Sequence, residues 1–148
     1  MEEHVSDWIT VPQAQVSAFA ELTNDNQYIH VNLEQAAQSP YGGTIAHGFL
    51  LVSLLTNFSQ KALPTFDDPD FHVVMSVNYG FNKIRFLSPV RTGSRIRGRI
   101  SHMDWREKGR GQVILSYDVS VDIEGEERPA LVARWLFLLA MKPKKSLD

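Results

Sequence analysis

The sequence contains no cysteine, which excludes disulfide bonds, thiolate metal sites and a cysteine nucleophile. Long hydrophobic runs are also missing, and the longest, Trp135 to Met141, is far too short to span a bilayer. The N-terminal residues are acidic and hold no apolar segment, so we expect no signal peptide and a cytoplasmic protein without a membrane partner. Positive charge is not in excess, since the net charge is −2, and this argues against a nucleic-acid partner.

With 148 residues and 43% hydrophobic content, the chain can bury a substantial core, and we expect one domain over residues 1–148. Helical spacing and cap signals predict helices over 10–22, with Thr10 as N-cap, and over 33–38 and 45–58. The last of these is apolar on nearly every side, so it should be buried all round.

From residue 73 the hydrophobic period changes to two, which predicts strands in 73–86, 95–100, 113–123 and 130–141. The phase of the first strand slips, and this indicates a bulge near Gly80 to Lys83. Helices in the first half followed by long antiparallel strands are typical of an α+β domain. A strongly curved antiparallel sheet wrapped around the apolar helix would enclose that helix.

Asp25 and His30 lie five residues apart in a short polar segment. Taken alone, Asp25 is typical of a turn, because the residues of the segment TNDN (23–26) favour turns by bonding to their own backbone. Taken alone, His30 is more typical of a structural residue than of a catalytic one. Together, a carboxylate and an imidazole on one loop can reach a single water and move protons. A metal site made by Asp25, His30 and His47 is the alternative reading.

A glycine segment, GGTIAHG at 42–48, opens the apolar helix. The first N–H groups of a helix lack partners and carry positive partial charge, so they can face a substrate oxygen. Gly43 and Gly48 allow close approach to the backbone, which serves packing as well as binding. Ser53, inside the helix, can bond back to the carbonyl four residues earlier.

The segments DNQYIH (25–30) and IAHGFLLVS (45–53) resemble the MaoC-like hydratases, the R-specific enoyl-CoA hydratase group of the hot-dog superfamily. That group's motif reads D-x-N-P-[IL]-H, followed after a short helix by [IV]-[AV]-H-G-[MF]-L. A second match, VNYGFNKIRF (77–86), resembles the narrower nodulation-protein-N-like branch. Gln27 and Tyr28 depart from the Asn and Pro of the wider motif, which bears on substrate preference more than on chemistry.

The resemblance implies a hot-dog fold, a dimer, and reversible hydration of a trans-2-enoyl thioester to the (R)-3-hydroxyacyl thioester. Carried over by position, Asp25 and His30 activate water, the Gly48 N–H stabilises the enolate oxygen, and Ser53 supports the catalytic loop. His47 is expected to be positional. This chemistry needs no metal and no redox cofactor.

The substrate is expected to be an acyl thioester of coenzyme A or of acyl carrier protein. Its binding candidates are Gly43, Asn78, Asn82, Lys83 and Arg85. Basic residues that could contact the phosphates of coenzyme A, or simply form a solvated strand face, also include Arg91, Arg95, Arg97 and Arg99.

Two rival functions remain from the sequence. A hot-dog thioesterase typically carries its carboxylate on the central helix, and no Asp or Glu lies between Ile45 and Lys61. A non-catalytic acyl-thioester-binding subunit would have no need of both Asp25 and His30.

Overall fold

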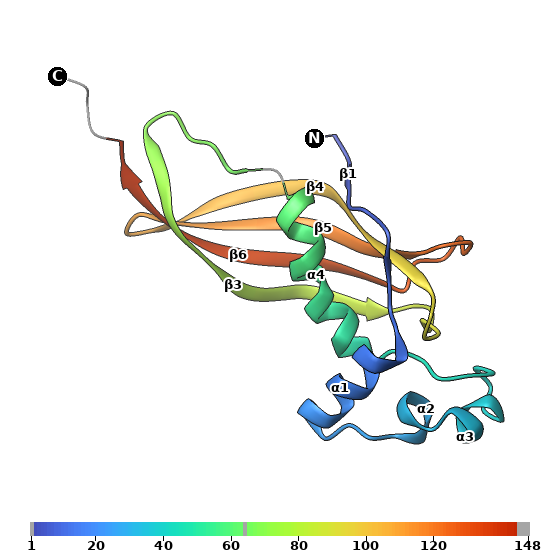
Figure 1. The fold of residues 1–148 in the computed structure, drawn as a ribbon. Helices are drawn as coiled ribbons and strands as arrows, with labels where there is room; N and C mark the ends of the chain where they lie inside the picture. Colours follow the sequence, from blue (N-terminus) through green and yellow to red (C-terminus); the bar gives the residue numbers. More distant parts are fainter. Residues whose placement is uncertain (1, 64, 145–148) are drawn as a thin grey trace.

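The computed structural model describes residues 2–63 and 65–144 (Figure 1). Two short strands precede the helices, and four long strands follow them. The elements in chain order are β1 (His4–Val5), β2 (Ile9–Thr10), α1 (Gln13–Thr23), α2 (Tyr28–Val31), α3 (Leu33–Ala37), α4 (Gly48–Ala62), β3 (Phe71–Phe86), β4 (Arg95–Gly109), β5 (Gln112–Ile123) and β6 (Leu131–Pro143).

All strands belong to one antiparallel sheet with the order β1–β4–β5–β6–β3, and β2 pairs with β4 next to β1. Figure 1 shows α4 crossing one face of this curved sheet, with α1, α2 and α3 gathered at its N-terminal end. The predicted α+β class is confirmed. Within the described chain the sheet covers one side of α4 and does not close around it.

The alternation of apolar and polar side chains along the strands accounts for the buried face of the sheet. In β4, Ile96 and Ile100 are buried while Arg97 and Arg99 are only half-buried, as the sequence predicts. β6 lies between β5 and β3, so both of its edges are paired. β4 extends to Gly109, well beyond the predicted end at residue 100.

The predicted bulge in β3 is also confirmed. Its pairing with β6 shifts register between Asn78 and Gly80 and again between Phe81 and Lys83. Gly80 has φ +144°, a backbone conformation that side chains with a Cβ rarely adopt, so glycine is required there. The shifts twist and bend the strand that forms the free edge of the sheet.

Three local predictions are wrong. Thr10 is not a helix N-cap: it belongs to β2, and α1 begins after Pro12, because the backbone here first pairs with β4. The long helix begins at Gly48, three residues later than predicted, since Ile45 forms a β-bridge with Arg91. It is not buried all round either, because Phe49 is 73% exposed and Ser53 lies on the same open side.

Close contact between helix and sheet depends on a glycine. A Cβ added at Gly98 of β4 would lie 2.5 Å from Cβ of Phe58, a buried residue of α4. Residues from both elements share one core cluster with β5 and β6. The missing side chain therefore sets how closely α4 lies on the sheet, and with it the place of the helix N-terminus.

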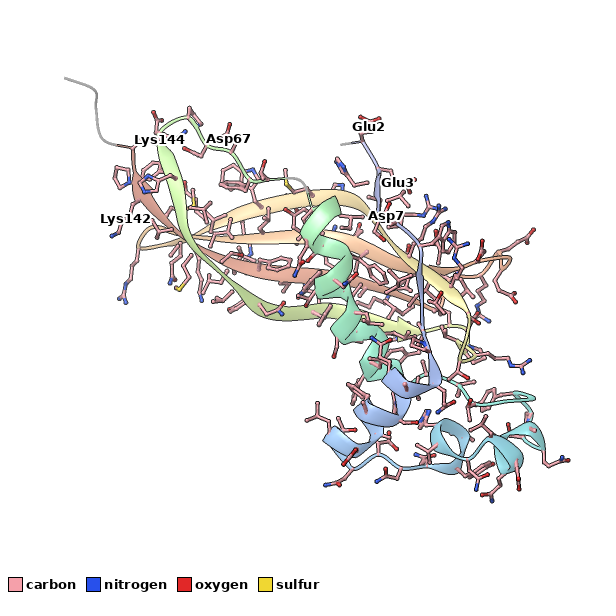
Figure 2. All side chains as sticks on the ribbon, in the orientation of Figure 1. Glu2, Glu3, Asp7, Asp67, Lys142 and Lys144 are labelled. Atoms are coloured by element: carbon pink, nitrogen blue, oxygen red, sulfur yellow. The ribbon has the colours of Figure 1, made fainter. Side chains whose placement is uncertain are left out.

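The N-terminal segment is fastened to β4 by charges and an aromatic ring. The guanidinium carbon of Arg97 lies 4.3 Å from the centroid of the Trp8 ring, and Glu3 pairs with Arg99. Figure 2 shows Glu2, Glu3 and Asp7 on this segment, while Asp67 and Lys144 sit together at the opposite end of the sheet. Among residues 2–63 and 65–144, no helix has the length and apolar character needed to cross a membrane.

Candidate active site

A cavity of about 640 Å³ opens at the N-terminal end of α4. Its walls come from α1, from Asp25 and His30, from the segment that starts α4, and from the end of β3 and the residues after it, 86–90. The lining from 86–90 is largely apolar and holds no ionisable side chain, whereas Asp25, His30 and His47 supply ionisable groups. The structure therefore brings together the two sequence features that were predicted to form one site.

His30 is buried, and its hydrogen bonding defines which ring nitrogen carries the proton. Its Nδ1 lies 2.7 Å from the main-chain oxygen of Ile45. Because a carbonyl can only accept, Nδ1–H is the donor, and in the neutral ring the lone pair is on Nε2. Asp25, half-buried in the loop after α1, lies in the same cavity wall. His30 is thus set up to accept a proton at Nε2 beside a carboxylate.

His47 immediately precedes α4 and contacts both predicted catalytic residues. Its Nε2 donates to the main-chain oxygen of Asp25 over 3.0 Å. Its ring stacks on that of His30, with centroids 3.8 Å apart and planes inclined by 22°. One candidate ligand atom from each of Asp25, His30 and His47 lies within 4.8 Å of the others.

The stacking argues against these three residues as ligands of one metal ion. An imidazole binds a metal in its own ring plane at about 2.0–2.1 Å from the nitrogen. Two rings stacked face to face and nearly parallel do not share such a point close to both. In each ring, one nitrogen also donates a hydrogen bond to a main-chain carbonyl and is therefore not free to bind a metal. The set fits acid–base chemistry better than metal ligation.

Gly48 is the first residue of α4 and lines the cavity. Its N–H has no acceptor among the residues that the structure describes, and His47 provides no side-chain cap. A Cβ at this position would lie 2.8 Å from the ring of Phe86. Glycine therefore permits a close approach of the aromatic ring to the helix start, where free N–H groups favour negative charge.

A part-buried hydrogen-bond network behind His30 was not predicted from the sequence. The Gln13 amide donates to the His30 main-chain oxygen over 2.8 Å, and Thr44 Oγ1 donates to Gln13 Oε1 over 2.6 Å. The hydroxyls of Thr44 and Thr92 are 2.7 Å apart. The sequence signal for this network is weak, since a glutamine near the start of a predicted helix, such as Gln13, has no pattern that names its partner.

Two of the predicted residues lie outside the cavity lining. Ser53 is exposed, and its hydroxyl donates to the Phe49 carbonyl four residues earlier over 2.9 Å. Gly43 packs against Arg91, whose Nη2 would be 2.6 Å from an added Cβ and donates to the Gly42 carbonyl. In the single chain, these contacts hold the helix and the turn rather than touch the cavity.

Three further predicted residues, Asn82, Lys83 and Arg85, line a separate groove of about 680 Å³. We call this the outer groove; its other walls include Asp118 and Arg134. Arg134 Nε donates to Asp118 over 2.8 Å, and this bond raises the pKa of Arg134 above its ordinary value.

Asn78, also predicted to bind substrate, accepts a hydrogen bond from the Trp135 indole. It lines neither the cavity nor the outer groove. One chain therefore does not bring the β3 candidates to Asp25 and His30.

Comparisons with known proteins agree with this architecture. A family model described as MaoC like domain matches residues 1–123. Nodulation protein N of Rhizobium leguminosarum bv. viciae is 45% identical over 139 residues, which are 93% of this chain and 84% of that protein. The 3-hydroxyacyl-thioester dehydratase Z of Mycobacterium tuberculosis is 41% identical over 128 residues, 86% of this chain and 82% of that protein.

Solved structures of other proteins superpose on this chain and identify its fold. The MaoC-like dehydratase from Rhodospirillum rubrum superposes with a TM-score of 0.75 at 16% identity, over 97% of this chain and 93% of its own. An (R)-hydratase from A. caviae involved in PHA biosynthesis gives 0.70 at 20% identity, over 92% of each chain. The hot-dog fold expected from the resemblance is confirmed.

Proposed function

The chain belongs to the MaoC-like dehydratase family, and from this membership we propose that it hydrates trans-2-enoyl-CoA thioesters reversibly to (R)-3-hydroxyacyl-CoA thioesters. The observation that carries the proposal is the pairing of Asp25 with a buried His30 whose Nε2 is the unprotonated nitrogen of the neutral ring. A general base needs a free lone pair beside the group it deprotonates.

The proposed reaction starts with a water held between Asp25 and His30. His30 Nε2 takes one proton as the water oxygen bonds to Cβ of the enoyl group, and the electron pair of the double bond moves toward the thioester. The Gly48 N–H is the proposed donor to the oxygen that gains charge. A proton from the same Asp25–His30 pair then goes to Cα, so that one water has been added across the double bond.

A direct assay tests this proposal. Crotonyl-CoA incubated with the protein should lose its conjugated enoyl absorbance, and chiral analysis should find the (R)-3-hydroxy product. His30→Ala, folded by circular dichroism, should not catalyse the reaction. The proposal is wrong if the wild-type protein leaves crotonyl-CoA and longer enoyl-CoA substrates unchanged, or if His30→Ala is as fast as the wild type.

The two rivals give different results with the same substrates. A thioesterase would release free coenzyme A, which a thiol reagent detects, whereas hydration releases none. A non-catalytic subunit would bind the thioester and do neither. Parallel assays on saturated and unsaturated acyl-CoA therefore assign one of the three functions.

We propose a homodimer formed along β3. This strand has no partner on its outer side within the described sheet, and it exposes large apolar side chains. Such an edge usually pairs or is protected by charges. The exposed members are Phe71, Val73, Val74, Met75, Val77 and Tyr79 in the first part of the strand and Phe86 at its end.

Light scattering coupled to size exclusion should give twice the chain mass for the wild type. Val77→Lys should shift the protein toward monomer, while Val132→Lys, on neighbouring β6, should not. Monomeric wild-type protein at micromolar concentration would contradict the dimer. Cytoplasmic location, a single domain over residues 1–148 and the supporting role of Ser53 remain predictions from the sequence.

A further inference from the structure

In the described part of the chain, His47 is the one ionisable side chain that contacts both Asp25 and His30 directly and that the proposed reaction does not use. We propose that His47 is a positioning residue, which aligns Asp25 and His30 through a donated hydrogen bond and a ring stack. The inference rests on the proposed function of the cavity. It assigns His47 no contact with the substrate.

The first argument is the crossed pattern of two hydrogen bonds. His30, in α2, donates to the carbonyl of Ile45, three residues before the first residue of α4, over 2.7 Å. His47, at the start of α4, donates to the carbonyl of Asp25, in the loop between α1 and α2, over 3.0 Å. Each imidazole is thus anchored to the segment that carries the other one. A substitution of His47 that removes the Nε2–H donor therefore removes this hydrogen bond from the main chain of Asp25.

The second argument is the stack. One contact of the His47 ring is His30, at 3.8 Å between centroids, and another is Phe19 of α1, at 5.0 Å. The His30 ring therefore has a fixed surface against one face, which limits its rotation and keeps Nε2 in one place. Displacements of about 1 Å in a reacting group can cost on the order of 100-fold in rate.

The third argument is that packing alone would not favour histidine here. His47 is only 3% exposed, and its Nδ1 has no hydrogen-bond partner among residues 2–63 and 65–144. A buried polar atom without a partner costs about 1–3 kcal/mol. A phenyl ring would stack without this cost, so the Nε2–H donor is the property that favours an imidazole.

Two variants distinguish the effect of the hydrogen-bond donor of His47 from the effect of its aromatic ring. The side chain introduced by His47→Gln can place an amide N–H near the position of Nε2, whereas His47→Phe keeps an aromatic surface without a donor. We expect His47→Phe to lower kcat at least about 10-fold with KM nearly unchanged, and His47→Gln to recover most of that loss. A core variant at the end of the sheet away from the cavity, Val113→Ala, chosen for equal loss of thermal stability, should keep the wild-type kcat.

A measurement that does not depend on enzymatic activity tests this inference separately from the proposed function. In ¹⁵N NMR spectra, the wild-type His30 ring should show one Nδ1-protonated tautomer with slow exchange of its N–H. His47→Phe should show faster exchange or mixed tautomers, and His47→Gln should lie closer to the wild type. Absence of hydration in the wild-type protein would overturn the proposed function and leave this spectral test intact. Unchanged kcat and an unchanged His30 spectrum in His47→Phe would show a purely structural residue.

Discussion

The cavity at the start of α4 and the outer groove on the sheet have similar volumes, about 640 and 680 Å³, but they are built differently. In the cavity, His30 and His47 are buried, and each is tied to main chain by a hydrogen bond. In the outer groove, Asp118 and Arg134 pair side chain to side chain and keep 46% and 35% of their side-chain surface exposed.

This difference indicates where chemistry is possible. Fixed polar groups in a partly dry site act strongly on a substrate, whereas exposed ion pairs are screened by water and contribute about 0–1 kcal/mol. The outer groove can attract an anionic part of a substrate, but it offers no group held in one place for proton transfer. Three substitution experiments test this contrast, and an alkaline titration tests how deeply β5 is buried next to the outer groove.

The largest difference should come from the same chemical change made in both regions. Asp25→Asn should lower kcat for enoyl-CoA hydration by about 10²–10⁴-fold, because an amide cannot take or deliver the proton. Asp118→Asn should stay within about twofold of the wild type, since its pair with Arg134 is exposed. Steady-state kinetics with crotonyl-CoA measure both. Equal losses would contradict the assignment of chemistry to the cavity.

An alkaline titration tests burial on β5, where Tyr117 lies in the core next to half-buried Asp118. Burial raises the pKa of Tyr117 from 10.0 to about 12. Between these pH values the tyrosine loses its proton in the unfolded chain but keeps it in the folded protein, so rising pH favours the unfolded chain. The free energy of unfolding should therefore be unaffected by this group below pH 10 and should fall by about 3 kcal/mol as the pH rises toward 12.

Urea unfolding at pH 9, 10.5 and 11.5, chosen as roughly bracketing this window, measures the loss. Tyr117→Phe should remove most of the pH dependence, while Tyr79→Phe, on exposed β3, should leave it unchanged. A Tyr117→Phe variant that loses stability over this window as steeply as the wild type would contradict the assignment.

Thr44→Val removes the hydroxyl that joins Gln13 and Thr92 behind His30. We expect a loss of about 1–3 kcal/mol in unfolding free energy, because buried polar partners are left unpaired, together with lower kcat. Thr44→Ser should recover both. Ser101→Ala, at the rim of the outer groove, should change stability by less than about 0.5 kcal/mol. A Thr44→Val protein with wild-type stability would show that the network has no effect on the fold.

The smallest effect should be on substrate affinity. Replacing Lys83 and Arg85 together by alanine should raise KM for an enoyl-CoA about threefold without changing kcat, as expected for exposed charges. Lys142→Ala, at the far end of β6 (Figure 2), should not change KM. An unchanged KM in the double variant would remove the outer groove from the substrate site.

Period-two alternation predicted most of the sheet because burial follows the pleat directly, as in Ile96 and Arg97 of β4. The same pleat explains why the β3 candidates lie away from Asp25 and His30 within one chain. Adjacent residues of a strand point to opposite faces, so Phe86 lines the cavity while Arg85 lines the outer groove. A motif that is continuous in the sequence therefore contributes to two different surfaces of the chain.

The candidate site could be predicted where its residues are close in the chain, as with Asp25 and His30. The contacts of Gln13 with Thr44, 31 residues apart, depend on how α1 packs over the start of α4, and no sequence pattern reports that packing. The exposed side of α4 was not predicted either, because the sequence pattern does not report that the sheet covers only one side of this helix and leaves Phe49 73% exposed.

The cavity divides its two tasks between separate stretches of the chain. The acid–base candidates Asp25, His30 and His47 lie within residues 25–48, whereas residues 87–89 line the cavity without an ionisable side chain. Selection for a new acyl group is therefore expected to act on these three consecutive codons, since Phe86 contacts Gly48 and Val90 is buried in the core. A library randomised only over 87–89 should yield variants whose preferred substrates differ while their dependence on Asp25 and His30 is inherited unchanged.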